Sequence, residues 1–558
     1  MLHALQYAYE IFCNRNFNPD RTYLGGDQIN LGGFTHLVHR RNVGQTISLR
    51  LDIDLTDRDD PFSFENETLT TILGESEEYR DLWNGAVERM AEVNSAWVKV
   101  DVAWSHAEQE AFVKAYEVGV NGESLAALAT TSPAARPMVT AFNPTHSLFK
   151  SETFEEEQKE IVAEAKASKG GGDDILLALG AAFLFPQLRP VLGTYAGARF
   201  IQECNRPEIK ALPKSVQQCS ATKPATSLGD SSLFPSNADI TLQSDIGNGA
   251  LPNWDNVLPL QLPTGEDITE TFNQLNVFFL SALIVGPGKA LAYDLQKMRY
   301  VGPIRAIPDR NFTPQQSDDP KRMATGLAAW DSLSTVEGLR DRVNKRLKKM
   351  DVAYTIEPRE LIHFTEGMLL SRLRELQNDP DAFADSSRLL SITKDIVSHQ
   401  FPEKRFVLHD ENNGIDVQLH DVGVGISQML PVIIETLNTK TGTILEIEQP
   451  ELHIHPKLQV ELADVFIAAS QASEKPIFLI ETHSEHLMLR FLKRIRETAE
   501  GELPPDMPKL DPARLAIYYI ESTTEGSQLV HIRVSEEGEF IDRWPSGFFE
   551  ERYEELFK

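Results

Sequence analysis

Residues 444–459 read ILEIEQPELHIHPKLQ, and this stretch decides the fold. An apolar run over 443–447 predicts a buried strand, and 458–470 has the spacing of a helix. The same pair recurs along the chain, because 476–480 (PIFLI) predicts a second buried strand and 485–495 a second helix. Apolar strands that alternate with helices predict a parallel sheet covered on both faces.

Acidic and polar residues follow the first of these strands. Glu448, Gln449 and Glu451 come directly after it. Open α/β sheets bind their ligands at the carboxyl ends of the strands. A carboxylate there can hold Mg²⁺, and a neighbouring group can orient an attacking water. The alternative interpretation is a strand-end turn with solvated acids.

Two further segments carry candidate chemistry. The first is DVGVGISQ at 421–428, which precedes an apolar helix, MLPVIIETL. Its glycines would let the backbone approach a phosphate at a helix start, and a tight loop is the alternative. The second is ETHS at 481–484, after the second strand. His483 could sense a γ-phosphate there, or Thr482 or Ser484 could simply cap the next helix.

The order of these segments resembles that of ABC-type (SMC/OLD-like) P-loop ATPases, in the branch of AAA-family ATPases with a DUF3696-like C-terminus. VGVGISQMLPVI is similar to their signature motif, ILEIEQPELHIHPKLQ to their Walker B strand and D-loop, and ETHSEHLMLR to their switch-histidine loop. YVGPIRAIPDRNF (300–312) and WPSGFFEERYEELF (544–557) also resemble segments of that branch. The resemblance covers most of 1–55 and 300–558 and is weak in 130–290.

The resemblance implies an α/β fold: an ABC-ATPase-like mixed sheet with flanking helices, an antiparallel β subdomain and a helical or irregular insertion. It implies ATP and Mg²⁺ as cofactors, and a head-to-tail homodimer that drives a partner such as a nuclease, in DNA repair or phage defence. Glu448 would hold Mg²⁺, Gln449 would take the catalytic-carboxylate position with Glu451 as a substitute, and His483 would be the switch histidine. The signature loop would complete the site of the opposite subunit through Gly423, Val424, Gly425, Ser427 and Gln428.

Several departures from the family pattern predict impaired hydrolysis. An amide at Gln449 cannot accept a proton as a carboxylate does, and Gly423 stands where a serine is common. No G-x-x-x-x-G-K-[ST] motif occurs, and the nearest match, LIVGPGKA at 283–290, is expected to be a turn beside a helix. We expect the P-loop upstream of Met1, and weak ATP binding by this chain.

Two other functions remain open at this point. The first is a pseudo-ATPase scaffold that neither binds nor hydrolyses ATP. The second is a metallohydrolase built on His453 and His455, with Glu448, His483 and His486 completing the site.

Composition limits the partners and the location. The 558 residues carry a net charge of −29, which repels nucleic acid, so DNA contact would need a local basic patch or a partner. A basic helix at 340–350 offers such a patch, although a solvated helix face is its expected role. Three cysteines without metal spacing predict a cytoplasmic protein, and the apolar run 175–188 is too short for a membrane span.

These patterns predict five segments along the chain. They are an ATPase lobe without its first strand and P-loop (1–125), an insertion (126–299), a linking helical region (300–400), the signature, Walker B and switch-histidine lobe (401–500), and a DUF3696-like tail (501–558). Within them we expect helices at 2–13, 151–167 and 270–300, antiparallel strands at 46–55, 97–104 and 111–118, loops at 205–260, and a hairpin after 515.

Overall fold

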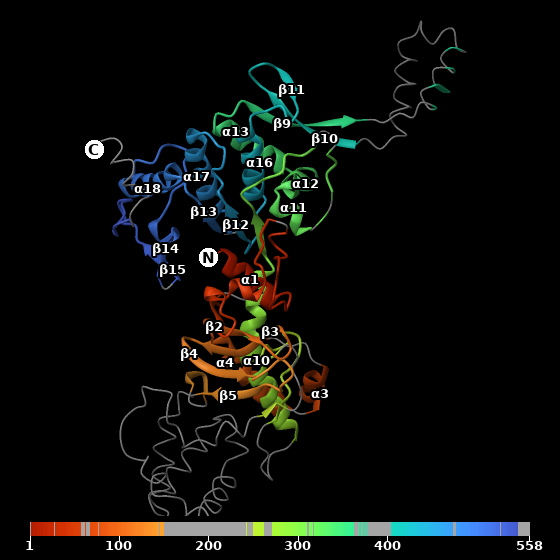
Figure 1. Cartoon of the computed structure of the whole chain (residues 1–558), viewed down its shortest axis with the longest axis vertical. Helices are drawn as coiled ribbons and strands as arrows, with labels where there is room; N and C mark the ends of the chain where they lie inside the picture. The colour runs from red at the N-terminus through yellow and green to blue at the C-terminus, as the bar shows by residue number, and fades with distance from the viewer. Residues whose placement is uncertain are drawn as a thin grey trace, which may run out of the picture. The chain divides into compact units, whose positions relative to one another are not determined.

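The computed structural model describes residues 2–56, 67–149, 249–261, 270–361 and 403–544 apart from short gaps, with Phe62, Thr241–Leu242 and some positions of 367–377. The described residues belong to two compact units (Figure 1). The first contains 3–20 and 31–296, and the second contains 21–30 and 297–558. The predictions for 151–167, 175–188, 205–240 and 545–557 lie outside the described residues.

The first unit is built on a five-stranded antiparallel sheet in the order β1-β2-β3-β4-β5. Alternate residues of the second strand, Val98, Val100 and Val102, are fully buried, as expected for a strand with one face in the core. The three strands predicted from the sequence are confirmed. The sheet also runs across the predicted boundary at residue 125 into the region predicted as an insertion. The strands are β1 (Ile47–Asp54), β2 (Ser95–Ser105), β3 (Glu110–Val120), β4 (Glu123–Ala129) and β5 (Met138–Phe142).

One long helix, α10 (Glu270–Leu295), crosses the core of this unit. The predicted turn at 283–290 is wrong, because LIVGPGKA continues the helix and Leu283 and Val285 are fully buried. This segment is therefore no phosphate-binding loop. The stretch Gln274–Leu295 is long and apolar enough to cross a membrane, but most of it is buried, which is typical of a core helix. The other elements of the unit are α1 (Leu2–Phe12), α2 (Phe34–Leu37), η1 (His39–Arg41), α3 (Glu67–Glu75), α4 (Glu77–Ala91), η2 (Ser147–Phe149), β6 (Thr241–Leu242) and β7 (Leu260–Gln261).

The second unit contains the predicted parallel sheet, in the order β13-β12-β8. Its strands are β8 (Met298–Val301), β12 (Ile444–Glu448) and β13 (Ile477–Glu481). The predicted order of strand, helix, strand and helix is confirmed. The first strand, β8, was missed, because the helix predicted over 270–300 ends at Leu295 and a four-residue strand follows it. Within the described part of the unit β13 is only partly covered, and its Ile477 is 53% exposed.

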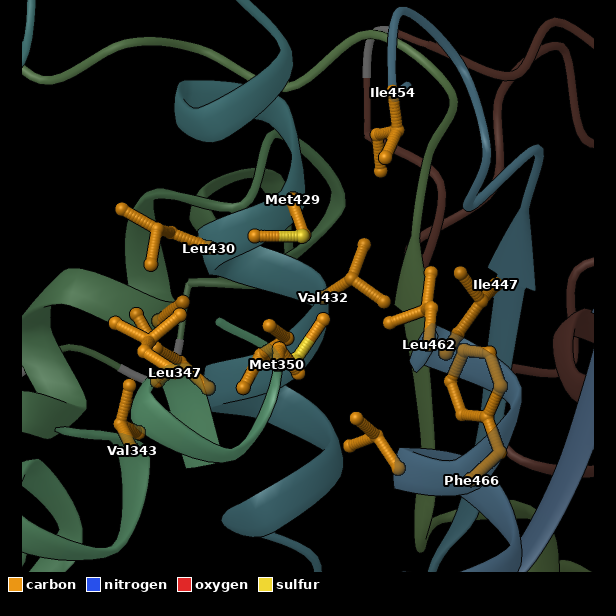
Figure 2. Close-up of a cluster of buried hydrophobic side chains, with 14 of the residues drawn as sticks. Val343, Leu347, Met350, Met429, Leu430, Val432, Ile447, Ile454, Leu462 and Phe466 are labelled. Atoms are coloured by element: carbon orange, nitrogen blue, oxygen red, sulfur yellow. The ribbon is translucent and has the colours of Figure 1, made fainter. Parts of the chain in front are cut away.

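Helices that precede β12 in the sequence and helices that follow it pack around this sheet. Figure 2 shows Leu347, Val432, Ile447 and Leu462 meeting in one apolar cluster, and all of these side chains are fully buried. The basic helix predicted at 340–350 is confirmed, and its apolar side chains join this core. Among the described residues, the helices of the unit are α11 (Pro320–Ala324), α12 (Leu327–Thr335), α13 (Leu339–Lys349), α16 (Val424–Leu437), α17 (Pro456–Ser470), α18 (Glu485–Glu500) and η5 (Pro512–Arg514).

Two antiparallel sheets complete the second unit. One has the order β11-β10-β9, and its pairing of β9 with β10 joins the regions predicted separately as 300–400 and 401–500. The other is the hairpin predicted after residue 515, which is confirmed. The strands are β9 (Tyr354–Leu361), β10 (Glu403–Asp410), β11 (Ile415–Val417), β14 (Ile517–Thr523) and β15 (Gly526–Ile532).

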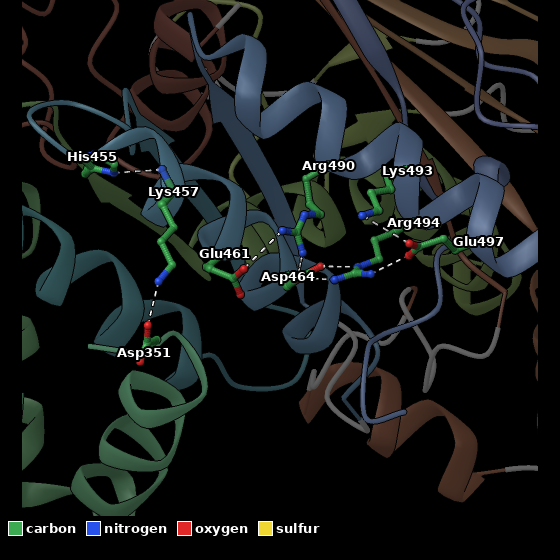
Figure 3. A network of polar contacts seen from close by, with 9 residues as sticks. All are labelled: Asp351, His455, Lys457, Glu461, Asp464, Arg490, Lys493, Arg494 and Glu497. Carbon is green, nitrogen blue, oxygen red and sulfur yellow. Dashed lines mark hydrogen bonds and ion pairs between the residues drawn. The ribbon is translucent and has the colours of Figure 1, made fainter. Parts of the chain in front are cut away.

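A buried network of ion pairs fastens α17 to α18 (Figure 3). Asp464 accepts two hydrogen bonds of 2.7 Å from Arg494, and both side chains are 3% exposed. Arg490 donates a third bond of 2.5 Å to the same carboxylate. Bidentate pairs of this kind fix geometry as well as charge. Because α17 and α18 begin directly after the loops that follow β12 and β13, the network also fixes those loops.

Candidate functional site

Two carboxylates end neighbouring strands of the parallel sheet. Glu448 is the last residue of β12 and pairs in register with Glu481, the last residue of β13. Burial raises the pKa of the Glu448 carboxyl, the Glu481 carboxylate raises it further, and the Tyr300 side chain opposes both. A group with a displaced pKa at the carboxyl edge of a parallel sheet is a candidate for function.

The loops that follow these strands are joined by hydrogen bonds. The backbone N–H of Gln449 donates to the Glu481 carbonyl at 2.9 Å. The Glu451 carboxylate accepts from the Thr482 hydroxyl at 2.8 Å and from the His483 amide at 2.7 Å. Both oxygens of Glu451 are therefore engaged in fixing the second loop.

The cap of α18 belongs to Ser484. Its hydroxyl accepts from the Leu487 amide at 3.0 Å and donates to Gln459 at 2.6 Å. Because Ser484 caps the helix and Thr482 donates to Glu451, the side chain of His483 has no part in capping α18. The His483 side chain is exposed, and its ring makes no hydrogen bond within the part of the chain that the structure describes.

The predicted signature loop forms the start of α16. Gly423 occupies the N-cap position, and Val424 is 50% exposed. Gly425 lies against the next loop, because a Cβ atom added there would be 2.6 Å from the His453 carbonyl oxygen. Ser427 is buried, and its hydroxyl donates to the Leu419 carbonyl at 3.0 Å. The exposed residues of 421–428 are thus Asp421, Gly423 and Val424.

A buried arginine, which the sequence did not single out, links this helix to the strand end. The Gln428 side chain accepts from the Arg305 amide at 3.0 Å and donates to the Arg305 carbonyl at 2.6 Å. The Arg305 guanidinium donates to the carbonyls of Glu448 at 2.7 Å and Gln449 at 3.2 Å. Burial lowers its pKa to about 10, so it stays protonated at neutral pH. In the sequence, only the family resemblance of segment 300–312 pointed to Arg305, and that resemblance gave the residue no role.

The segments around residues 423, 448 and 483 therefore meet at one edge of one sheet. Residues 332–488, which contain all three, match the family model described as AAA ATPase domain, and 510–558 match the model described as Protein of unknown function (DUF3696). The chain contains an AAA ATPase domain followed by a DUF3696 segment. The resemblance to an AAA-family ATPase with a DUF3696-like C-terminus is thereby confirmed over these two segments. No curated protein matches the chain.

The ATPase domain implies nucleotide binding, and its strand end fits the accompanying cation. Mg²⁺ at nucleotide sites is commonly bound through one or two carboxylates together with phosphates, and Glu448 offers such a carboxylate. The first amides of α16, at Val424 and Gly425, have no intrahelical acceptor and suit an anion. Ser427 and Gln428 use their side chains inside the domain, so their predicted contact with nucleotide stays a prediction, as do the roles of the other site residues.

The ATPase domain does not support the metallohydrolase interpretation. His455 is the N-cap residue of α17, and its ring accepts from the Lys457 backbone N–H at 3.2 Å. His453 is exposed on the loop before it. Across the described ranges, no group of three or more His, Cys, Asp and Glu side chains is arranged to hold a metal ion.

Proposed function

We propose that the AAA ATPase domain binds ATP with Mg²⁺ at the ends of β12 and β13, and that it hydrolyses ATP slowly. The observation that carries this proposal is that Glu448, Gln449 and His483 are held at one sheet edge. The backbone N–H of Gln449 donates to the Glu481 carbonyl, and the backbone N–H of His483 donates to the Glu451 carboxylate. Glu448 would hold the cation, Gln449 would lie beside the attacking water, and the free ring of His483 would face the γ-phosphate.

Slow hydrolysis follows from the groups beside the strand end. The side-chain amide of Gln449 is a poor proton acceptor. Both carboxylate oxygens of Glu451 already accept hydrogen bonds, from the Thr482 hydroxyl and the His483 backbone N–H. The same observations favour the second candidate function, a scaffold whose ATP site does not turn over. The sequence has no G-x-x-x-x-G-K-[ST] motif, so we expect ATP affinity weaker than micromolar for this chain.

The partners follow from the exposed start of α16. Gly423 and Val424 are accessible, which suits a head-to-tail homodimer in which they approach the nucleotide of the other subunit. A nuclease or another effector, acting in DNA repair or phage defence, would be driven by that dimer. DNA contact would fall on α13, where the exposed Arg342 and Lys345 make no ion pair within the described residues.

A photoreactive ATP analogue linked through its γ-phosphate tests the proposal, because crosslinking detects weak binding. We expect Mg²⁺-dependent labelling of peptides from 421–428, 448–456 and 481–486, which excess ATP prevents. Glu448→Gln should abolish the Mg²⁺ dependence. Glu337→Gln, which alters an exposed carboxylate just before α13, is the matched control and should change nothing. Labelling spread over the chain, or unchanged in Glu448→Gln, would refute nucleotide binding at this edge.

A further inference from the structure

The loop between β12 and α17 contains two residues in a strained backbone conformation. Gln449 has φ of +43° and His453 has φ of +63°. Left-handed backbone is unfavourable for residues other than glycine, and it persists where the surroundings enforce it. The contacts that enforce it at these positions therefore control the loop that adjoins Glu448.

Arg305 supplies the contact at Gln449. Its guanidinium donates to the two carbonyls that flank Gln449, those of residues 448 and 449. Arg305 is 2% exposed, and its Nε has no hydrogen-bond partner within the described residues. A buried cation bonded to carbonyls rather than to a carboxylate is a costly way to stabilise a fold. A positioning role explains this arrangement better, because the guanidinium fixes the peptide groups on both sides of the strained Gln449.

The first turns of α16 control both strained residues. Gln428 holds the backbone of Arg305 through two hydrogen bonds, of 3.0 and 2.6 Å. Gly425, one turn earlier, lies against the carbonyl of His453. A shift of this end of α16 would therefore alter the support of Gln449 and of His453 together.

We infer that Arg305 is a positioning residue that couples the exposed start of α16 to the backbone of Gln449. Whatever binds at Gly423 and Val424 changes the position of Gln428, and Arg305 carries this change to the loop beside Glu448. The consequence for turnover rests on the proposed function. The coupling itself does not, because it concerns contacts within the chain.

Hydrogen–deuterium exchange of the full chain tests the coupling without nucleotide. We expect Arg305→Met to raise exchange in peptides covering 449–455 about tenfold, the order set by the strain of one left-handed residue. Arg299→Met is the matched control, since Arg299 also anchors α16, through an ion pair of 2.7 Å to the buried Glu435. This control should raise exchange in α16 and leave 449–455 protected.

The decisive variant is Arg305→Met with Gln449→Gly. Glycine adopts a left-handed conformation without cost, so the second substitution should restore protection of 449–455 if Arg305 acts by holding Gln449. Absence of this rescue, or equal exchange in the two arginine variants, overturns the inference. If Arg305→Met does not fold, Gln428→Met releases the Arg305 backbone and should give the same pattern in weaker form. Failure of ATP to label the chain would refute the proposed function and leave this exchange result standing.

Discussion

Two glycines in the signature loop allow a sharp test of its packing. Gly425 lies in the first turn of α16, and an added Cβ would be 2.6 Å from the carbonyl oxygen of His453. That oxygen belongs to the backbone of a loop tied by the bond from the Ile454 amide to the Glu451 carbonyl, so it cannot swing away as a side chain would. Overpacking of this kind costs about 1–3 kcal/mol, and a rigid neighbour puts Gly425→Ala in the upper half of that range.

Helix propensity acts in the opposite direction. Replacing a helical glycine by alanine gains about 1 kcal/mol. The net expectation for Gly425→Ala is therefore a loss of about 1–2 kcal/mol. In a domain of 150–250 residues this lowers the Tm by roughly 2–8 °C. Thermal unfolding of the full chain, followed by circular dichroism, measures it.

Gly423→Ala is the matched control, two residues earlier in the same loop. Nothing lies within 4 Å of the Cβ that it would add, and its φ of −58° suits alanine. The gain from a stiffer unfolded chain and the loss of a favourable N-cap residue are each about 0.5–1 kcal/mol and oppose one another. We expect little change in Tm. If Gly425→Ala raises the Tm, as propensity alone predicts, the close approach of α16 to the loop is refuted.

Three further predictions concern the strand ends and the helices behind them. The pKa of Glu448 is higher in the native state than in the unfolded chain, so the native state loses stability as pH rises from the ordinary pKa of glutamate through the native pKa. Glu481→Gln should lower the native pKa of Glu448. The urea midpoint of this variant should therefore fall less between the ordinary pKa of glutamate and neutral pH. Asp464→Ala removes the carboxylate that Arg490 and Arg494 share and leaves the buried Arg494 with Glu497 alone, so it should cost about 3 kcal/mol in denaturant unfolding, whereas Lys457→Ala, which breaks a fully exposed pair, should change the free energy of unfolding far less; equal losses would refute the role of burial. Gln449→Glu should raise ATP turnover once a P-loop is supplied, and unchanged turnover would place Gln449 away from the attacking water.

Local patterns predicted those parts of the fold in which the residues themselves carry the signal. The strands β12 and β13 are short apolar runs, and the helices after them show the spacing of buried faces, so their order could be predicted. The strand β8 could not, because it has only four residues, too few to show an alternating pattern, and only two residues separate it from the end of α10. The prediction for LIVGPGKA was wrong because its local signal was clear but misleading. Its glycines and proline favour a turn, yet burial inside α10 outweighs that preference.

The candidate site shows the same division. Glu448, Gln449 and His483 could be proposed because they follow strands whose ends meet at one edge. The engagement of Glu451 with the opposite loop depends on a contact across 32 residues of sequence, which no local pattern contains. Arg305 is further removed, since it lies 143 residues from Glu448 and outside the matched segment 332–488. Single motifs identify candidate groups, and only the folded chain identifies what holds them.

The distribution of these contacts indicates where the site can change most easily. The strands are paired in register, and a buried ion-pair network fixes the helices behind the loops. Between these rigid parts, the loop at 449–455 keeps two left-handed residues in place through a few hydrogen bonds and one close approach. Relaxing Gln449 and His453 would release strain, whereas moving a strand or a helix would break buried pairs. A ligand that shifts the start of α16 should therefore alter this loop before any other part of the ATPase domain, and the group at position 449 would change its place relative to Glu448 as a result.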